Sequence, residues 1–194
     1  MTTSIWLRDE EPRPRRAPQL TRERIVGEAV GLLDADGIDG LTMRKLAQRL
    51  GVTSTALYWH VTTKDDVLDL AVDEIFGEVA LPAPGDDWRA DVRRLVRGWR
   101  DAMLAHPWAP ALIGRPLLGP HVLARTEFLQ GALGRGGHRD LDLEVITRVV
   151  ANYVIGAAVT EATWRRTATG PAAWDEDLLF DRGLDMILRS GPQG

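Results

Sequence analysis

The sequence contains no cysteine, and this absence excludes several kinds of chemistry. Without a thiol, the chain has no disulfide, no cysteine nucleophile and no cysteine-based metal site. It also has no uninterrupted apolar run of the roughly 18 residues that a membrane span needs, and residues 1–11 lack the apolar stretch of a signal peptide. We therefore expect a soluble, cytoplasmic protein with no membrane partner.

The sequence also lacks an excess of positive charge, because it has 24 basic and 28 acidic residues and a formal net charge of −4. The distribution is uneven, since residues 1–64 hold 10 basic and only 8 acidic side chains. A protein that coats nucleic acid indiscriminately would be basic throughout. Any contact with nucleic acid is therefore predicted for the N-terminal third of the chain.

Motifs of catalysis and metal binding are missing as well. The glycine-rich segment 134–137 is not preceded by a strand pattern and is not followed by the Lys-Ser/Thr of a phosphate-binding loop. His106, His121 and His138 lack metal-ligand spacing, and no nucleophile elbow or paired-carboxylate signature is present. We predict no catalytic residue, no metal site, no cofactor and no enzymatic activity.

Helical periodicity dominates what the sequence does contain. Thr21 is a suitable N-cap for a first helix that Gly37 should end, and Thr63 with Asp66 forms a capping-box pattern. No alternation typical of a strand is present, so we predict an all-α fold. The expected helices are 21–36, 43–50, 54–60, 64–81, 86–105, 108–114, 119–134, 141–166 and 173–189.

The segment 43–60 has the pattern of a helix-turn-helix. Such a motif needs a small residue where two helices cross, a glycine in the turn and an apolar residue that fixes the second helix, and Ala47, Gly51 and Leu57 fill these places. The outward positions of the second helix then carry polar and aromatic groups suited to base edges and phosphates. These residues are Ser54, Thr55, Tyr58, Trp59 and His60.

This segment resembles the DNA-binding domain of the tetracycline-repressor (TetR) family of transcriptional regulators. The resemblance rests on residues 38–52 (IDGLTMRKLAQRLGV), on 56–61 (ALYWHV) and on Lys64, and it continues more weakly through 114–116 and 153–156 to Glu161. It implies an N-terminal three-helix helix-turn-helix domain followed by a helical domain for effector binding and dimerisation. It further implies a homodimeric repressor that binds double-stranded operator DNA and is released by a small-molecule effector.

The resemblance also assigns domains and roles. We expect a flexible, proline-rich arm at 1–19, the DNA-binding domain at 20–66, and the effector-binding and dimerisation domain at 67–194. The resemblance implies that Thr42 and Arg44 reach the DNA backbone or base edges and that Ser54 and Thr55 lie near bases. Phosphates or thymine methyl groups are the implied contacts of Tyr58, Trp59, His60 and Lys64.

Two departures from the tetracycline repressors change the expected specificity. The segment 53–55 (TST) replaces a longer amide side chain followed by proline, so a different operator is expected. Aligned on Arg115-Pro116, Ala111 stands where those repressors have a metal-binding histidine, which argues against a metal-chelated tetracycline as effector. The side chains predicted to line an effector cavity are Trp99, Met103, His106, Phe128, Asn152 and Tyr153.

The segment Leu141–Trp164 carries apolar residues around much of its circumference and should be buried on two sides. We expect it to pack with Trp174–Leu188 against the same pair of a second subunit. A charge at Ala157 or Leu184 is then expected to give monomers.

Plainer interpretations stay open. The large side chains of the C-terminal region also suit an ordinary core, and the N-terminal helices could serve a helical enzyme or ligand-binding domain as a protein contact. A steep salt dependence of DNA binding would separate a DNA-binding protein from these alternatives.

Overall fold

The computed structural model describes residues 20–81, 83–112, 118–167 and 174–189, and the predicted arm at 1–19 lies outside them. The described residues contain helices and no strand, so the all-α prediction is confirmed. The elements are α1 (Arg22–Gly40), α2 (Met43–Leu50), α3 (Ser54–Tyr58), α4 (Lys64–Gly77), α5 (Trp88–Ala105), the 3₁₀ turn η2 (Ala109–Ala111), α6 (Pro120–Arg135), α7 (Asp140–Thr167) and α8 (Glu176–Arg189).

The first three helices form a small unit, here called the head, and each has a threonine as its N-cap. The hydroxyl oxygens of Thr21, Thr42 and Thr53 accept a hydrogen bond from the backbone N–H three residues later. α4 begins with the predicted capping box, because Thr63 accepts from the N–H of Asp66 and the Asp66 carboxylate accepts from the N–H of Thr63 at 2.9 Å. That backbone hydrogen bond also holds the pKa of the Asp66 carboxyl below its usual range.

Several helix ends differ from the prediction. Gly37 adopts φ 69° and interrupts the helical path as expected, but another turn follows and α1 ends only at Gly40. α3 ends at Tyr58 rather than His60. The helix expected at 108–114 is the three-residue turn η2, since Pro107 and Pro110 restrict the backbone around it.

α4 ends at Gly77, earlier than the prolines at 82 and 84 indicated, and a side chain from α6 occupies its end. The guanidinium of Arg125 donates to the carbonyl oxygens of Gly77 and Val79, both at 2.9 Å. In return, the Asp73 carboxylate of α4 accepts from the backbone N–H of Val122 in the first turn of α6 at 3.0 Å. These two contacts cap both helices and fix α4 to α6.

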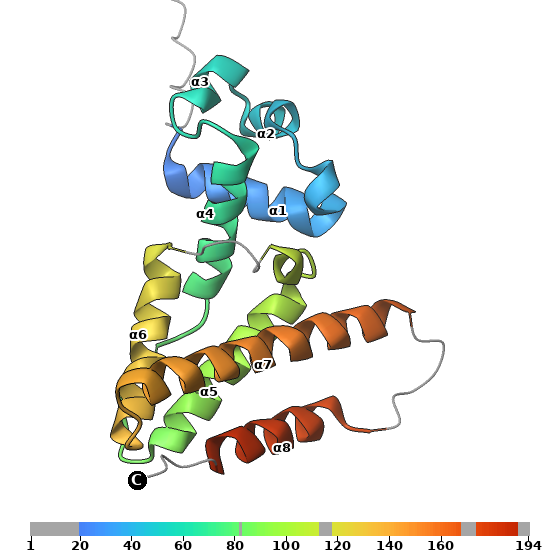
Figure 1. Cartoon of the computed structure of the whole chain (residues 1–194). Helices are drawn as coiled ribbons and strands as arrows, with labels where there is room; N and C mark the ends of the chain where they lie inside the picture. Colours follow the sequence, from blue (N-terminus) through green and yellow to red (C-terminus); the bar gives the residue numbers. More distant parts are fainter. Residues whose placement is uncertain (1–19, 82, 113–117, 168–173, 190–194) are drawn as a thin grey trace, which may run out of the picture.

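α4 also connects the head to the remaining helices, here called the core bundle (Figure 1). It contacts α1 on one side and α6 on the other, while α5 packs between α6 and α7. The predicted domain boundary after residue 66 falls inside α4 and remains a prediction. α8 lies beside α7 at the outer edge of the bundle (Figure 1).

α7 was expected to be buried on two sides, but within one chain only one side is buried. Val150, Val154 and Ala158 face the bundle and are fully buried, whereas Val145 and Val149 are exposed on the opposite side. The second side of α7 is therefore uncovered in the single chain.

α8 is divided in the same way. Leu184 and Leu188 lie in the core of the chain itself, while Leu178, Leu179 and Met186 are exposed. The expectation that a charge at Leu184 would act on a subunit interface was therefore wrong, because that charge would first disrupt the chain's own core.

α7 is also long and apolar enough, by length and composition, to cross a membrane, although the sequence shows no uninterrupted apolar run of that length. Its Glu161 is buried and ion-paired with Arg100 of α5 at 2.7 Å. A core helix of a bundle passes the same test, and the contacts of α7 with α5, α6 and α8 are those of such a helix.

Candidate functional site

The turn between α2 and α3 is closed by Gly51, which adopts the left-handed conformation with φ 68° and ψ 30°. Its N–H donates to the Gln48 carbonyl at 3.1 Å, and the N–H of Val52 donates to the Ala47 carbonyl at 3.0 Å. This pair of bonds satisfies the carbonyls at the end of α2 and turns the chain sharply into α3. Leu57 is completely buried and fixes α3 against α2, as the sequence pattern indicated.

Because Leu57 points inward, its neighbours on α3 point to solvent. Trp59 is 84 % exposed and Tyr58 is 50 % exposed, so two large aromatic side chains lie side by side in solvent. Ser54, Thr55 and His60 are exposed as well. The structure thus gathers the five outward residues of the motif on one short helix and the turn that follows it.

The cations near this surface differ in what they contact. Lys45 pairs with Asp36 at 3.4 Å, and Arg49 pairs with Glu28 at 2.9 Å. Arg44, next to the exposed N-cap Thr42, makes no hydrogen bond or ion pair with any residue that the structure describes. Arg44 of α2 therefore presents an exposed guanidinium that has no partner among the residues with described placement.

Lys64 was expected to contact DNA, but in the structure its ammonium group already has a partner in the chain. Its ammonium donates to the backbone carbonyl of Ile38 at 2.7 Å and is partly buried. Lys64 therefore links the start of α4 to the last turn of α1, a role that only the folded chain reveals.

A second cluster, here called the joint, connects the head to the core bundle and was not predicted. Asp34 of α1 accepts the indole N–H of Trp108 at 2.7 Å, and the same oxygen lies 2.8 Å from Nδ1 of His106. Nε2 of that imidazole lies 3.5 Å from the Glu78 carboxylate at the end of α4. The partners stand more than 70 positions from Asp34, so no spacing in the sequence could have indicated this contact.

The six side chains predicted for the effector cavity lie on α5 and its C-cap, on α6 and on α7, and that they line one common cavity stays a prediction. Trp99 and Met103 are buried in α5, and Trp99 packs edge-to-face on Phe76 of α4 at 6.0 Å. The indole nitrogen of Trp99 is buried without a hydrogen-bond partner in the described part of the chain. His106 belongs to the joint, and Phe128 is half-buried on α6.

The last two, Asn152 and Tyr153, line a cavity of about 330 Å³ between α7 and α8. The Tyr153 hydroxyl donates to the Phe180 carbonyl at 2.8 Å, and burial raises the pKa of this phenol. Arg100 at the cavity base donates to Glu161 at 2.8 Å and to Asp177 at 2.6 Å. Burial disfavours the charged guanidinium, but these two carboxylates outweigh it and raise the Arg100 pKa.

No metal-binding arrangement is found among the residues with described placement, where three or more His, Asp or Glu side chains never gather suitably. The joint brings one imidazole to two carboxylates, but its atoms are engaged in hydrogen bonds with one another and with Trp108. What the described geometry offers is a surface for recognition on α2 and α3 and a contact that connects that surface to the core bundle.

Two family models match the chain. The model of "bacterial regulatory proteins, tetR family" matches residues 25–71, which contain the helix-turn-helix. The model of the "tetracyclin repressor-like, C-terminal domain" matches residues 81–182, which contain most of the core bundle.

Two relatives extend this similarity. An HTH-type transcriptional regulator of Saccharopolyspora erythraea is 49 % identical over 164 residues, covering 84 % of this chain and 69 % of the relative. The HTH-type transcriptional repressor DrrR1 of Streptomyces coeruleorubidus is 32 % identical over 197 residues, covering 96 % of this chain and 71 % of the relative.

Solved structures show the same fold. ActR of Streptomyces coelicolor, crystallised with actinorhodin, superposes with a TM-score of 0.78 at 30 % identity and covers 88 % of this chain and 96 % of its own. BioQ bound to its double-stranded DNA operator superposes with a TM-score of 0.74 at 29 % identity and covers 88 % and 97 %. The similarity therefore spans the head and the core bundle together.

Proposed function

The chain belongs to the tetR family of bacterial regulatory proteins and is a DNA-binding transcriptional regulator, and we propose that it is a homodimeric repressor that a small molecule releases from its operator. The observation that carries this proposal is the exposed aromatic and hydroxyl surface of α3, together with the exposed Arg44 of the preceding helix α2. An operator-bound neighbour and a relative named as a repressor support it. We place this regulator in the cytoplasm, where its DNA lies.

We assign direct base readout to Ser54 and Thr55, because they stand at the exposed start of α3 and carry short hydroxyl side chains. Arg44 and Tyr58 suit phosphates, and the broad indole of Trp59 suits thymine methyl groups or the sugar backbone. Thr42 keeps its hydroxyl proton available for a phosphate, since the cap uses only the oxygen as acceptor. His60 extends this surface at the turn after α3.

Lys64 has two roles in this proposal. Its bond to Ile38 orients the head on α4, so replacing it changes the placement of α3 as well as the charge near DNA. A Lys64 variant therefore tests folding and DNA binding together, whereas an Arg44 variant tests charge alone.

We propose that two copies pair through the uncovered faces of α7 and α8. Val145, Val149, Asn152, Gly156 and Val159 follow one another at intervals of three or four residues on the exposed side of α7. This is the spacing of a helix-packing stripe. The exposed residues of α8 extend the same apolar surface.

We propose that the effector enters the core bundle near Trp99. A buried N–H without a partner is costly unless a ligand or water accepts it, so this indole is a ready donor for an acceptor group on the effector. Met103 and Phe128 supply apolar surface on α5 and α6. The neighbour crystallised with actinorhodin supports an effector-responsive mechanism without naming the compound for this chain.

Footprinting on the DNA that flanks the gene of this protein tests the proposal. A protected site with two half-sites about one helical turn apart is expected for a dimer whose two α3 helices enter successive major grooves. Binding to that site should weaken steeply with salt, as phosphate contacts require. Absence of a protected site, or binding that salt does not change, would contradict operator recognition.

A further inference from the structure

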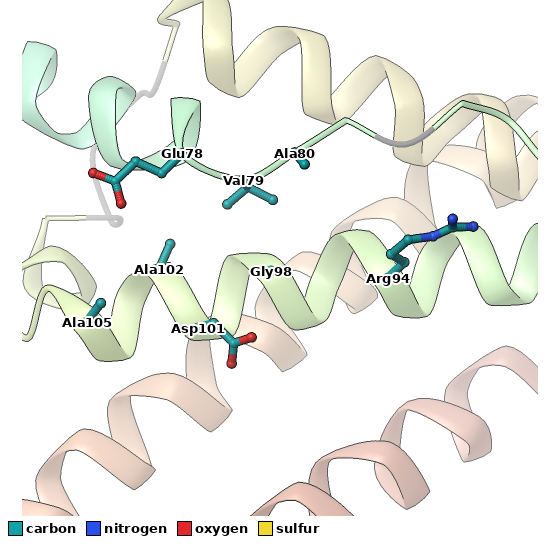
Figure 2. A pocket seen from close by; sticks show the side chains of 8 residues that line it. All are labelled: Glu78, Val79, Ala80, Arg94, Gly98, Asp101, Ala102 and Ala105. Carbon is teal, nitrogen blue, oxygen red and sulfur yellow. The ribbon is translucent and has the colours of Figure 1, made fainter.

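A groove lies between the end of α4 and α5, next to the joint that holds the head. It encloses about 410 Å³, a size typical of small-molecule sites. In Figure 2, Glu78, Val79 and Ala80 form one wall, and α5 forms the other. The α5 residues that line it are Arg94, Gly98, Asp101, Ala102 and Ala105.

The groove exists because α5 presents small side chains here. Gly98, Ala102 and Ala105 stand at intervals of four and three residues and so share one face of the helix. At Gly98 the two walls touch, since an added Cβ would come within 2.7 Å of the Val79 side chain. Beyond this contact, the alanines leave an apolar space that a short hydrocarbon or aryl group can fill.

Two carboxylates and one guanidinium line the groove, those of Glu78, Asp101 and Arg94. The Arg94 guanidinium pairs with Asp91 at 2.8 Å, and Arg135 contacts the other oxygen of that carboxylate at 2.5 Å. No lysine or arginine with described placement forms an ion pair with Glu78 or Asp101. Asp101 is close enough to Arg97 to help raise the pKa of that guanidinium, so Glu78 is the carboxylate of the groove that is left for a ligand. A carboxylate beside an apolar groove complements a cation with a small apolar body.

Glu78 faces two partners. Its carboxylate lines the groove and also lies 3.5 Å from Nε2 of His106, whose other nitrogen lies 2.8 Å from Asp34 of the head. A cation that binds Glu78 competes with the imidazole for this carboxylate. Occupation of the groove thus acts on the contact that orients α1.

We propose that this groove binds an organic ammonium ion with a short apolar chain or ring, at a site other than the effector site proposed near Trp99. The ammonium group pairs with Glu78, the body lies on Ala102 and Ala105, and the released His106 changes the position of the head. The effect on operator affinity rests on the proposed function of the chain. Linkage requires that operator DNA change the affinity for the ammonium ion by the same factor.

Calorimetry on the full chain with 4-phenylbutylammonium, and with the neutral 4-phenylbutan-1-ol as matched probe, tests the site. The amine should bind about tenfold more tightly than the alcohol, and Glu78→Gln should remove this preference. Glu74→Gln is the control, because Glu74 is exposed one turn earlier on α4 and does not line the groove. Ala105→Leu should weaken both probes by filling the space. Equal binding of amine and alcohol, or equal affinities of the Glu78 and Glu74 variants, would overturn the assignment.

Operator binding measured with and without saturating amine tests the connection to the head. The operator dissociation constant should change about threefold or more in the native chain and in Glu74→Gln, but not in Glu78→Gln. An operator affinity that the bound amine leaves unchanged in the native chain would refute the connection. If the native chain binds no operator without amine, the proposed function fails, whereas normal operator binding without amine binding refutes the groove alone.

Discussion

The indole N–H of Trp108 and the carboxylate of Asp34 meet at 2.7 Å across the boundary between the core bundle and the head. His106 shares the same oxygen, so one carboxylate satisfies two nearly buried ring nitrogens. Asp34→Ala should therefore lower the free energy of unfolding by about 1–3 kcal/mol, because both ring groups lose their acceptor. Urea denaturation measures this change.

Asp36→Ala is the matched control for this prediction. Asp36 is exposed on the same helix and contacts Lys45 at 3.4 Å, so its removal should cost about 0–1 kcal/mol. Equal losses in the two variants would show that the joint does not stabilise the protein.

Gly51→Ala should destabilise the head through the backbone alone. An added Cβ meets no atom within 4 Å, but φ is +68°, where a residue with a Cβ is disfavoured by about 1–2 kcal/mol. Gly27→Ala, in the middle of α1 and equally open, should instead stabilise the protein by about 0.5–1 kcal/mol. Thermal unfolding followed by circular dichroism should show shifts of opposite sign, and a shift of the same sign would contradict this explanation.

Arg44→Ala should weaken binding to every operator variant alike, because an exposed guanidinium with no partner in the described part of the chain contributes charge to phosphate contacts. The slope of log affinity against log salt should decrease by about one. Arg97→Ala removes a cation from α5, where it pairs with Asp181, and should leave the slope unchanged. Fluorescence anisotropy at several salt concentrations measures both, and identical slopes for the two variants would count against Arg44.

Gly156→Glu should produce folded monomers. Gly156 is exposed on α7 with no atom within 4 Å of an added Cβ, so the single chain accommodates the new side chain. At a helix–helix interface the carboxylate would be buried without a partner, and dimer affinity should fall about tenfold or more. Light scattering should give 21.5 kDa for this variant.

Gly131→Glu provides the control, since Gly131 is equally open but lies on α6. Its mass should be twice that of the monomer. A dimer in both variants would place the subunit interface away from α7.

Stability in acid should depend on Asp177. The hydrogen bond from Arg100 holds the pKa of this carboxyl below its ordinary value of 3.8. Because the pKa is depressed in the folded state, the stabilisation is complete above the ordinary pKa of 3.8. It is lost as the pH falls from there through the lower pKa of the folded state. Asp177→Asn should be less stable than the native chain near neutral pH and should lose less stability below about pH 4. Urea unfolding midpoints of both proteins, measured from pH 3 to 7, test this prediction. Parallel curves of midpoint against pH for the two proteins would contradict this role of the ion pair.

Local chemistry explains why so much of the fold could be predicted. The threonine caps, the Thr63–Asp66 capping box and the left-handed Gly51 each depend on residues within a few positions of one another. Leu57 could be assigned to the interior for the same reason, because one buried position on a short helix fixes which neighbours face solvent. The candidate DNA surface on α3 follows from these local rules.

Tertiary structure alone decided the remaining features, because their partners are far apart in the chain. Nothing in the spacing of Asp34 and Trp108 indicates their contact, and nothing before α6 indicates that Arg125 ends α4 at Gly77. Lys64 has the position of a phosphate contact in the sequence, yet folding brings it onto the Ile38 carbonyl. Helical periodicity reports which face is apolar but not what covers that face. The sequence therefore determined the helices and the candidate DNA surface, and only packing determined how the head is joined to the core bundle.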